Sequence, residues 1–399
     1  MKYKFSLLFL LLAAILTANS VFSLLGTPWR YYGNDVYGMG MGESGGSDLF
    51  RINTNYFNPS LATTANKVIF STATSLGFIW YKDKHSTYRD DGLYFPYFTF
   101  AIPLNQHKIA FSFNSSTSGN IENESEGIWE ELAYNEINRL SSSIYKVDLL
   151  YALKNDIINA GIALNYYFGH RTRYWKMDFE SSSLVDPKYE LEKNFSQAGY
   201  SLGISKKHKN ISWGLAYSSP VNLQGDIIFK YVHAPYADTL DTDTDYIYQL
   251  PAVASGGIVW RWQEKFKTAL DFVYEFSSGL DNFDNDSYKL AAGFGYDPLS
   301  GYGQWWQQIP YRLGIYYREL PFESNLNPVT EFGVTAGISI PLRSPDQKID
   351  LALGWSQRGN INDNDLQDQS LLLTLGVTGF DIFSKRQKKT AHRDIPMPD

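Results

Sequence analysis

Large apolar residues alternate with small or polar residues along most of this chain of 399 residues. In the stretch 158–170, INAGIALNYYFGH, an extended backbone places Ile162 and Leu164 on one side and Ala163 and Asn165 on the other. Successive side chains of a β-strand point to opposite faces, so each such stretch is predicted to be a strand with one apolar surface. Either a second sheet or lipid must cover that surface.

The residues opposite the apolar side distinguish between these two kinds of cover. They are mostly Gly, Ser and Ala with occasional charges, as in AGYSLGIS (198–205) and FKTALDFVYEF (266–276). A soluble sandwich packs its large residues inward and exposes long polar side chains. A membrane barrel instead directs large residues to lipid and tolerates charges in a wet interior. We therefore predict an all-β fold, a transmembrane antiparallel β-barrel.

The alternating segments number about fourteen if 210–232 is one strand kinked at Pro220, and an even number places both chain ends in the periplasm. Short links, such as 154–157 and 263–266, alternate with longer polar segments, which we interpret as external loops. The longest of these polar segments are 82–92, 116–137, 171–192 and 220–246. The predicted strands are 67–81, 93–103, 107–116, 138–153, 155–170, 193–206, 210–232, 248–262, 265–278, 287–297, 310–320, 330–341, 347–358 and 369–380.

The two ends of the chain have their own composition. Two lysines precede the apolar run SLLFLLLAAIL, and small residues follow it, which predicts a signal peptide over residues 1–23, cut after Ser23 or Ser20. The run is short for a membrane-spanning helix, which needs about 20 residues. Residues 381–399 are basic and are expected to form a periplasmic tail after a barrel over 67–380. The expected location is the outer membrane of a Gram-negative-type envelope.

Composition supports this class of protein and excludes others. Aromatic residues make up 16% of the chain, as aromatic girdles require, and the chain has no cysteine for a disulfide or a lipid anchor. Its mean hydropathy of -0.29 is too polar for a bundle of membrane helices. The net charge of -7 gives no support for nucleic-acid binding.

Residues 24–66 do not alternate. They contain the Gly-rich stretch YGMGMGESGGSDLF and then Asn58-Pro59, a composition typical of irregular structure. A fourteen-stranded barrel is wider than one that wall side chains can fill. We therefore expect residues 24–66 to fold into the lumen as an N-terminal plug, or hatch.

The sequence resembles the FadL/TodX family of outer-membrane transporters over the order and length of the whole mature chain. The shared elements are Gly40-Met41-Gly42, Asn58-Pro59-Ser60, the segment GLAYSSPVNLQGDI (214–227) and the hairpin 250–276. The resemblance implies a passive transporter for hydrophobic small molecules such as long-chain fatty acids or aromatic hydrocarbons. It also implies capture outside, transfer to a lumenal pocket, and exit when the plug shifts or through a gap in the wall.

Two departures keep a second function open. The family's small, acidic stretch before Asn-Pro is replaced here by the bulky DLFRINTNYF, and the chain continues past its last strand. A relative of PorV, a barrel of similar type that handles proteins, is the alternative. Such a barrel would dock secreted proteins or envelope partners without transporting small molecules.

Three sets of side chains are candidate functional residues. Inward charges would either pair across the lumen, tying plug to wall, or line a path, and inward valines and leucines would contact a hydrophobic ligand. The candidates are Gly40, Met41, Gly42, Asn58 and Pro59 in the plug; Arg261, Asp271, Glu275, Arg312 and Arg318 as lumenal charges; and Leu150, Val253, Val259 and Val273 along the ligand pathway.

We predict no enzymatic activity, because the six histidines fall in expected loops, turns or the tail and form no His-centred cluster. Asp241, Asp243 and Asp245 lack the Gly and late Glu of an EF-hand loop, so we interpret them as solvated loop and expect no metal or cofactor. The expected partners are outer-membrane lipid and a hydrophobic ligand, with a secretion or envelope protein as the alternative. A monomer is expected.

Overall fold

The structure is a computed structural model that describes residues 20, 22, 29–129, 132–179, 185–233, 236–281, 283–298, 304–342 and 347–379. Within them, no helix is long and apolar enough to cross a membrane. The elements are β1 (Trp29–Arg30), α2 (Val36–Met39), η2 (Pro59–Thr64), β2 (Ile69–Lys82), β3 (Thr87–Tyr94), β4 (Tyr97–Leu104), β5 (His107–Trp129), β6 (Leu132–Leu153), β7 (Asn159–Phe179), β8 (Lys188–His208), β9 (Ile211–Ser218), β10 (Val221–His233), β11 (Tyr236–Leu250), β12 (Ala252–Trp262), β13 (Phe266–Phe276), β14 (Ser287–Tyr296), η3 (Trp305–Gln308), β15 (Tyr311–Ser324), β16 (Asn327–Pro341), β17 (Lys348–Gly359), α3 (Ile361–Asn364) and β18 (Gln367–Thr378).

Strands β2 to β18 close into an antiparallel barrel, because β18 pairs with β2 over Gln367–Thr378. Three wall strands are each broken at a proline, which cannot donate to the ladder. Pro96 separates β3 from β4, Pro220 separates β9 from β10, and Pro251 separates β11 from β12. In the described residues the wall thus has fourteen strands, which confirms the predicted fold class.

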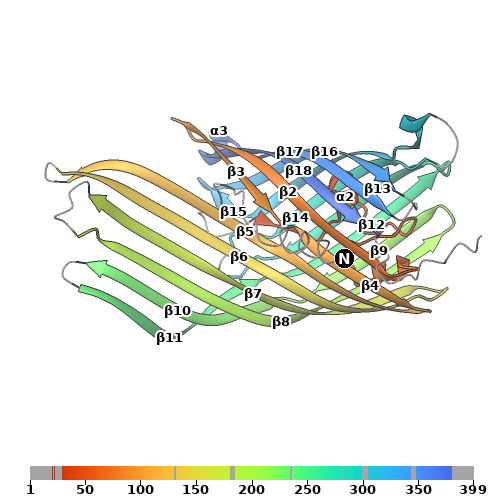
Figure 1. The fold of residues 1–399 in the computed structure, drawn as a ribbon, viewed down its shortest axis with the longest axis horizontal. Helices are drawn as coiled ribbons and strands as arrows, with labels where there is room; N and C mark the ends of the chain where they lie inside the picture. Colours follow the sequence, from red (N-terminus) through yellow and green to blue (C-terminus); the bar gives the residue numbers. More distant parts are fainter. Residues whose placement is uncertain are drawn as a thin grey trace, which may run out of the picture.

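The long polar segments are not loops in the structure. β5, β6, β7, β8, β10 and β11 continue through most of them and extend far beyond the ring (Figure 1). We call these extensions the extracellular sheet. Hydrogen-bonded pairing continues without an apolar face, as between β7 and β8 from Asn159↔Ser205 to Lys176↔Lys188. The prediction of long external loops was therefore wrong, because alternation reports one-sided burial and not backbone pairing.

The apolar face of the strands points outward, as the alternation predicts. Leu164 is 64% exposed and Leu270 is 59% exposed, whereas Ala163 and Ala269 on the opposite face are buried. Aromatic rings lie at the periplasmic ends of the strands, where Trp262 stacks on Phe266 with ring centroids 5.0 Å apart. An outward apolar band with an aromatic rim is the surface that a bilayer covers.

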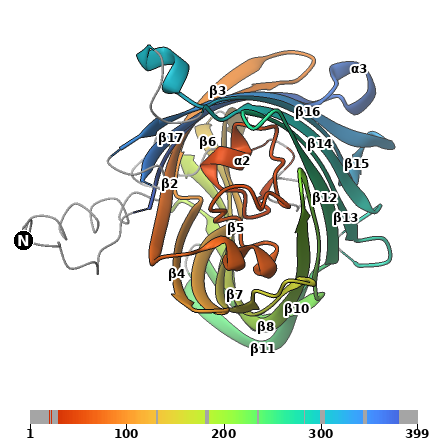
Figure 2. The same ribbon diagram turned by 90° about the vertical axis from the view of Figure 1, so that its right-hand side faces the viewer.

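The N-terminal segment lies inside the ring (Figure 2). β1 pairs with β5, and α2, which follows it in the chain, lies inside the ring. Asp35 caps α2 by accepting a hydrogen bond from the Gly38 N–H at 2.9 Å. The predicted lumenal plug is therefore present, although its first part is a short strand.

Candidate functional site

The plug contacts the wall through glycines on both sides. A Cβ atom built on Gly314 would lie 2.1 Å from the backbone N of Gly42, and one built on Gly293 would lie 2.4 Å from the Met41 carbonyl oxygen. Real Cβ atoms essentially never approach closer than 3.0 Å. Only glycine therefore allows the plug backbone to lie against β14 and β15 at these points. Gly42 also has a φ of +71°, which favours glycine independently.

A second backbone contact involves Asn58-Pro59. A Cβ on Gly161 would lie 2.5 Å from the Pro59 carbonyl carbon, and one on Gly203 would lie 2.1 Å from Asn58 Oδ1. Asn58 caps η2 by accepting from the Ser60 N–H at 3.1 Å. At these positions the small residues of the inner wall accommodate the plug backbone.

Ion pairs tie the plug to the periplasmic end of the wall. Lys267 Nζ lies 2.7 Å from Asp48 of the plug and 2.8 Å from Asp297, which follows β14. Arg51 lies 2.5 Å from Asp35 and 3.2 Å from Asp48. Burial opposes ionisation of Asp297, but Lys267 outweighs it and holds the pKa of Asp297 at about 2. Arg51 likewise holds the pKa of Asp35 below its usual range despite burial.

The ring of Tyr37 is the centre of this cluster. Arg51, Lys267, Arg312 and Lys348 each place their cationic group 4.1 to 4.5 Å from its centroid. The Tyr37 hydroxyl donates to Asp297 at 2.8 Å. A π face stabilises cations most when they are desolvated. One plug side chain thus contacts cations from three wall strands.

A second ion-pair group lies between the plug and strands β14 to β17. Glu43 of the plug is 3.0 Å from Lys289 and 3.2 Å from Arg318. Arg318 is 3.6 Å from Glu331, which also pairs with Arg358 at 3.1 Å. Removing one member of a buried pair is costly because the other charge stays buried. This group therefore holds the segment after Gly42 against the wall.

The predicted lumenal charges take different positions. Arg312 pairs with Asp350 at 3.2 Å, and Asp271 accepts from the Gly46 N–H of the plug at 2.7 Å. Glu275 is buried, at 3% exposure. Arg261 lies at the periplasmic rim, because its guanidinium donates to the Glu264 carbonyl in the turn after β12 at 2.7 Å.

Sequence reasoning missed the other members of these ion-pair groups. Lys267 and Lys289 were identifiable from strand parity, since both share the inward face of their strands. The plug carboxylates Asp35, Glu43 and Asp48 carried no such signal, because the plug does not alternate. Their roles follow only from contacts between segments more than two hundred residues apart.

The four predicted pathway residues face inward but are covered by the plug. Leu150 packs in a cluster with Tyr56 and Ala62 of the plug. Val259 packs with Tyr37 and Met41. Val253 and Val273 pack with Tyr32. They contact the plug in this conformation, and their role in a ligand pathway stays a prediction.

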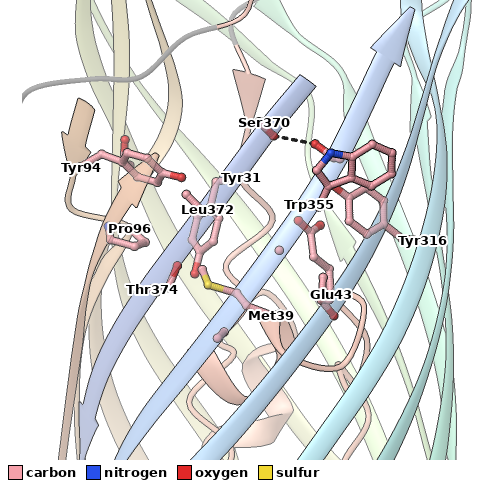
Figure 3. A pocket seen from close by; sticks show the side chains of 15 residues that line it. Tyr31, Met39, Glu43, Tyr94, Pro96, Tyr316, Trp355, Ser370, Leu372 and Thr374 are labelled. Atoms are coloured by element: carbon pink, nitrogen blue, oxygen red, sulfur yellow. Dashed lines mark hydrogen bonds between the residues drawn. The ribbon is translucent and has the colours of Figure 1, made fainter. Parts of the chain in front are cut away.

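A cavity of about 80 Å³ lies between the plug and the wall (Figure 3). Tyr31, Met39 and Glu43 of the plug line one side of it. The wall contributes mostly small or apolar groups. Its wall residues are Tyr94, Pro96, Ser115, Tyr316, Thr335, Ala352, Gly354, Trp355, Ser356, Ser370, Leu372 and Thr374.

The wall strands diverge beside this cavity. β4 pairs with β5 only as far as Tyr97↔Asn114, and no pairing of β3 with β5 occurs in the described residues. β5 instead pairs with β1 of the plug at Thr117 and Ser118. Tyr94 and Pro96 mark the break and line the cavity. The sequence prediction of one strand over 93–103 was wrong at Pro96, where the structure ends β3 and begins β4.

The described residues hold no cluster of three or more His, Asp or Glu side chains that could bind a metal ion. The side chains of residues 241–245, which include the predicted solvated aspartates, lie outside the described set.

Nearly the whole chain matches one known family. The family model described as BamG matches residues 8–388. The chain belongs to the BamG family. No curated protein matches it.

Several solved barrels share the fold of this BamG-family chain. A Pseudomonas aeruginosa FadL homologue aligns with a TM-score of 0.64 at 11% identity, covering 88% of this chain and 99% of the homologue. The Ralstonia pickettii toluene transporter TbuX aligns with a TM-score of 0.60 at 13% identity, covering 87% of this chain and 98% of TbuX. The P. putida toluene transporter TodX aligns with a TM-score of 0.58 at 14% identity, covering 86% of this chain and 96% of TodX. At these identities the similarity establishes a FadL-like fold.

Proposed function

We propose that this chain is an outer-membrane passive uptake channel for hydrophobic small molecules. The observation that carries the proposal is the cavity between plug and wall, which lies where β3 leaves β5. The lining of this cavity is mostly apolar with a few polar groups, which is typical of small-molecule sites. The solved barrels with this fold include toluene transporters, which agrees with the proposal.

The proposed route enters from the extracellular side, passes through the cavity and leaves sideways between β3 and β5. β3 and β5 do not pair in the described residues, and the last hydrogen bond between the two wall segments runs from the Ser115 N–H to the Pro96 carbonyl at 3.0 Å. β1 satisfies the backbone of β5 at Thr117 and Ser118, which a membrane barrel needs at an open edge. The plug blocks a direct path along the barrel axis. Whether the cargo is a long-chain fatty acid or an aromatic hydrocarbon is decided by the assay below.

The test fills the cavity without disturbing its walls. A Cβ on Gly354 meets only Thr335 Cγ2, at an ordinary 3.6 Å, so Gly354→Phe should project into the empty space. The matched control is Leu353→Phe, one residue away on the outward, lipid-facing side. Uptake of labelled toluene and of a labelled fatty acid is measured in vesicles. We expect Gly354→Phe to stop uptake and Leu353→Phe to preserve it. Unchanged uptake in both variants would contradict the proposed route.

A second candidate function is docking of a secreted or envelope protein on the extracellular sheet. The observation that favours it is the edge of β5 from Gly119 onward, which pairs with β6 on one side and with no described strand on the other. A long unpaired edge accepts an added strand. Three glutamates, Glu122, Glu124 and Glu126, also protect it from self-association. Wild-type vesicles that take up neither probe would favour docking.

A further inference from the structure

The extracellular sheet, which extends beyond the ring in Figure 1, carries a row of aromatic side chains on the face that continues the barrel interior. Trp175 on β7 is the cross-strand partner of Tyr189 on β8, and Tyr189 is the cross-strand partner of Tyr231 on β10. Strand parity gives the face, because Tyr189 and the buried Phe195 are an even number of residues apart on β8. Phe229 lies two residues from Tyr231 on the same face of β10.

The four rings form one continuous stack. The centroids of Trp175 and Tyr189 are 5.3 Å apart, with an angle of 18° between the ring planes. Phe229 follows at 6.3 Å from Tyr189, and Tyr231 follows at 5.9 Å from Phe229. All four residues are only half-buried, so they are not core residues. They are not an aromatic girdle either, because a girdle contacts lipid on the outward face of a barrel.

The stack ends at Trp175. Tyr189 covers one face of the Trp175 indole, which leaves the other face turned toward β6. The cross-strand partner of Trp175 on β6 is Asn138, and the partner of Asn138 on β5 is Asn123. Among the described residues, no ring of β5 or β6 contacts Trp175. Short amide side chains therefore border an aromatic face that no further ring covers.

Glu136 on β6 fixes the position of this indole. Trp175 Nε1 donates to Glu136 Oε1 at 2.8 Å, and Asn138 Nδ2 donates to the same oxygen at 3.0 Å. These two hydrogen bonds lower the pKa of Glu136, so its carboxylate is ionised at neutral pH. No described residue donates to the other oxygen, Oε2. One carboxylate oxygen thus remains available as a strong acceptor beside the open face of Trp175.

We propose that this end of the stack is a carbohydrate-binding site, in which a pyranose ring stacks on Trp175 and its hydroxyl groups bond to Glu136 and Asn138. The face of a pyranose carries polarised C–H bonds, which the negative π face of an indole attracts. Hydroxyl groups at the ring edge donate and accept, which matches a carboxylate and an amide. Asn123, one strand farther along the row at about 5 Å, contacts the next sugar residue of a chain.

Other ligands fit this surface less well. A hydrocarbon would stack on Trp175 but would give Glu136 and Asn138 no hydrogen bonds. A nucleic-acid base would also stack, but its phosphates would lie near the Glu136 carboxylate. Polysaccharide of the cell's own surface and polysaccharide from outside share the required chemistry. The inference does not rest on the proposed uptake function, since the site lies on the extracellular sheet and not at the cavity.

The test measures the retardation of the full-length purified protein in native gels that contain hydroxyethyl cellulose, glycogen or the cell's own outer-membrane polysaccharide freed of lipid. The detergent has a polyoxyethylene head, because a maltoside head would itself be a sugar ligand. The variant Trp175→Leu keeps an apolar side chain and removes the flat ring. The matched control Tyr174→Leu removes a ring one residue away, on the outer face of the same strand. An unchanged trypsin fragment pattern verifies that each variant keeps the extracellular sheet.

We expect at least one polysaccharide to retard the wild type, and Trp175→Leu to weaken that binding about 10-fold. Tyr174→Leu should bind as the wild type does. Trp175→Tyr should retain most of the binding, because it keeps an aromatic face. Glu136→Gln should weaken binding less than Trp175→Leu, because an amide oxygen is a weaker acceptor than a carboxylate. The polysaccharide that retards the wild type identifies whether the ligand comes from the cell's own surface or from outside.

Three results would overturn the inference. In the first, none of the three polysaccharides retards the wild type. In the second, Trp175→Leu and Tyr174→Leu lose retardation equally, which would show that the ring only supports the sheet. In the third, Trp175→Leu loses binding of an oligothymidylate probe but keeps that of the polysaccharides, which would assign the stack to nucleic-acid bases. Uptake of toluene or fatty acid in vesicles is unaffected in each case, so failure here is distinct from failure of the proposed function.

Discussion

Replacing Gly314 by Ala should loosen the plug while leaving the barrel closed. The added Cβ would lie 2.1 Å from Gly42 N and from the Met41 carbonyl carbon, both of which are backbone atoms. The plug must therefore withdraw by roughly 1 Å to reach even the shortest normal contact. The wall cannot yield instead, because β15 is paired on both sides at Gly314, with Gly293 and Thr335.

The cost follows from the bonds next to this contact. Gly42 N–H donates to Thr335 Oγ1 at 2.6 Å, and loss of a buried hydrogen bond costs about 1 to 3 kcal/mol. Glu43, the next residue, neutralises Lys289 and Arg318, and breaking a buried pair costs about 3 to 5 kcal/mol. We expect the conformation with the plug against β14 and β15 to be destabilised by about 3 to 5 kcal/mol. This is enough to populate a conformation in which the plug is withdrawn from the wall.

The assay uses the absence of native cysteine. Ser47 is a buried plug residue, so Ser47→Cys should react with a water-soluble thiol reagent only when the plug is displaced. Gly314→Ala should raise both its labelling rate and single-channel conductance. Gly354→Ala is the control, because its Cβ meets only an ordinary contact at 3.6 Å. If a folded Gly314→Ala barrel labels and conducts like the control, the glycine contact does not seat the plug. Deleting residues 27–60 would be a less specific test, since it also removes the plug partners of Lys267, Lys289 and Arg318.

Three further outcomes are expected. Leu164→Arg, on the outward face, should lower the free energy of unfolding in lipid vesicles by about 2 to 4 kcal/mol, and Leu164→Met by less than about 1.5 kcal/mol; equal losses would argue against lipid contact. The pKa of Asp297 is about 2, below its unfolded value of about 3.9, so its pairing with Lys267 stabilises the fold above pH 4 and is lost as pH falls toward 2. Asp297→Asn should reduce the pH dependence of the free energy of unfolding across that window. Solvent screening makes the reduction smaller, because the carboxylate is partly exposed. An unchanged pH dependence would show that the pair is dispensable. Phe22 is buried against Leu320 and Phe322, and the buried Ser20 hydroxyl donates to Asp368, so the mature chain should retain both residues; an intact mass that corresponds to cleavage after Ser23 would contradict this.

Local pattern determined the barrel. The side on which Leu164 or Leu270 lies depends only on the two-residue period of an extended chain, and a closed lipid-covered barrel is the arrangement that satisfies large residues outside and small ones inside. Of the three prolines that break wall strands, the sequence prediction identified Pro220, whereas the predicted strands 93–103 and 248–262 ran through Pro96 and Pro251. The Gly-rich composition of residues 24–66 likewise indicated a segment outside the wall.

Tertiary structure decided what those small residues and inward charges do. In the sequence Gly314 is one of many small residues on the inner face. Only the structure shows that Gly42, far away in the chain, lies against it. Lys289 and Arg318 acquire a role only when Glu43 lies between them. The extracellular sheet was invisible to alternation because both of its faces contain polar residues. Such contacts depend on how the plug packs inside the closed barrel. A local two-residue period carries no information about contacts between segments that far apart in the chain.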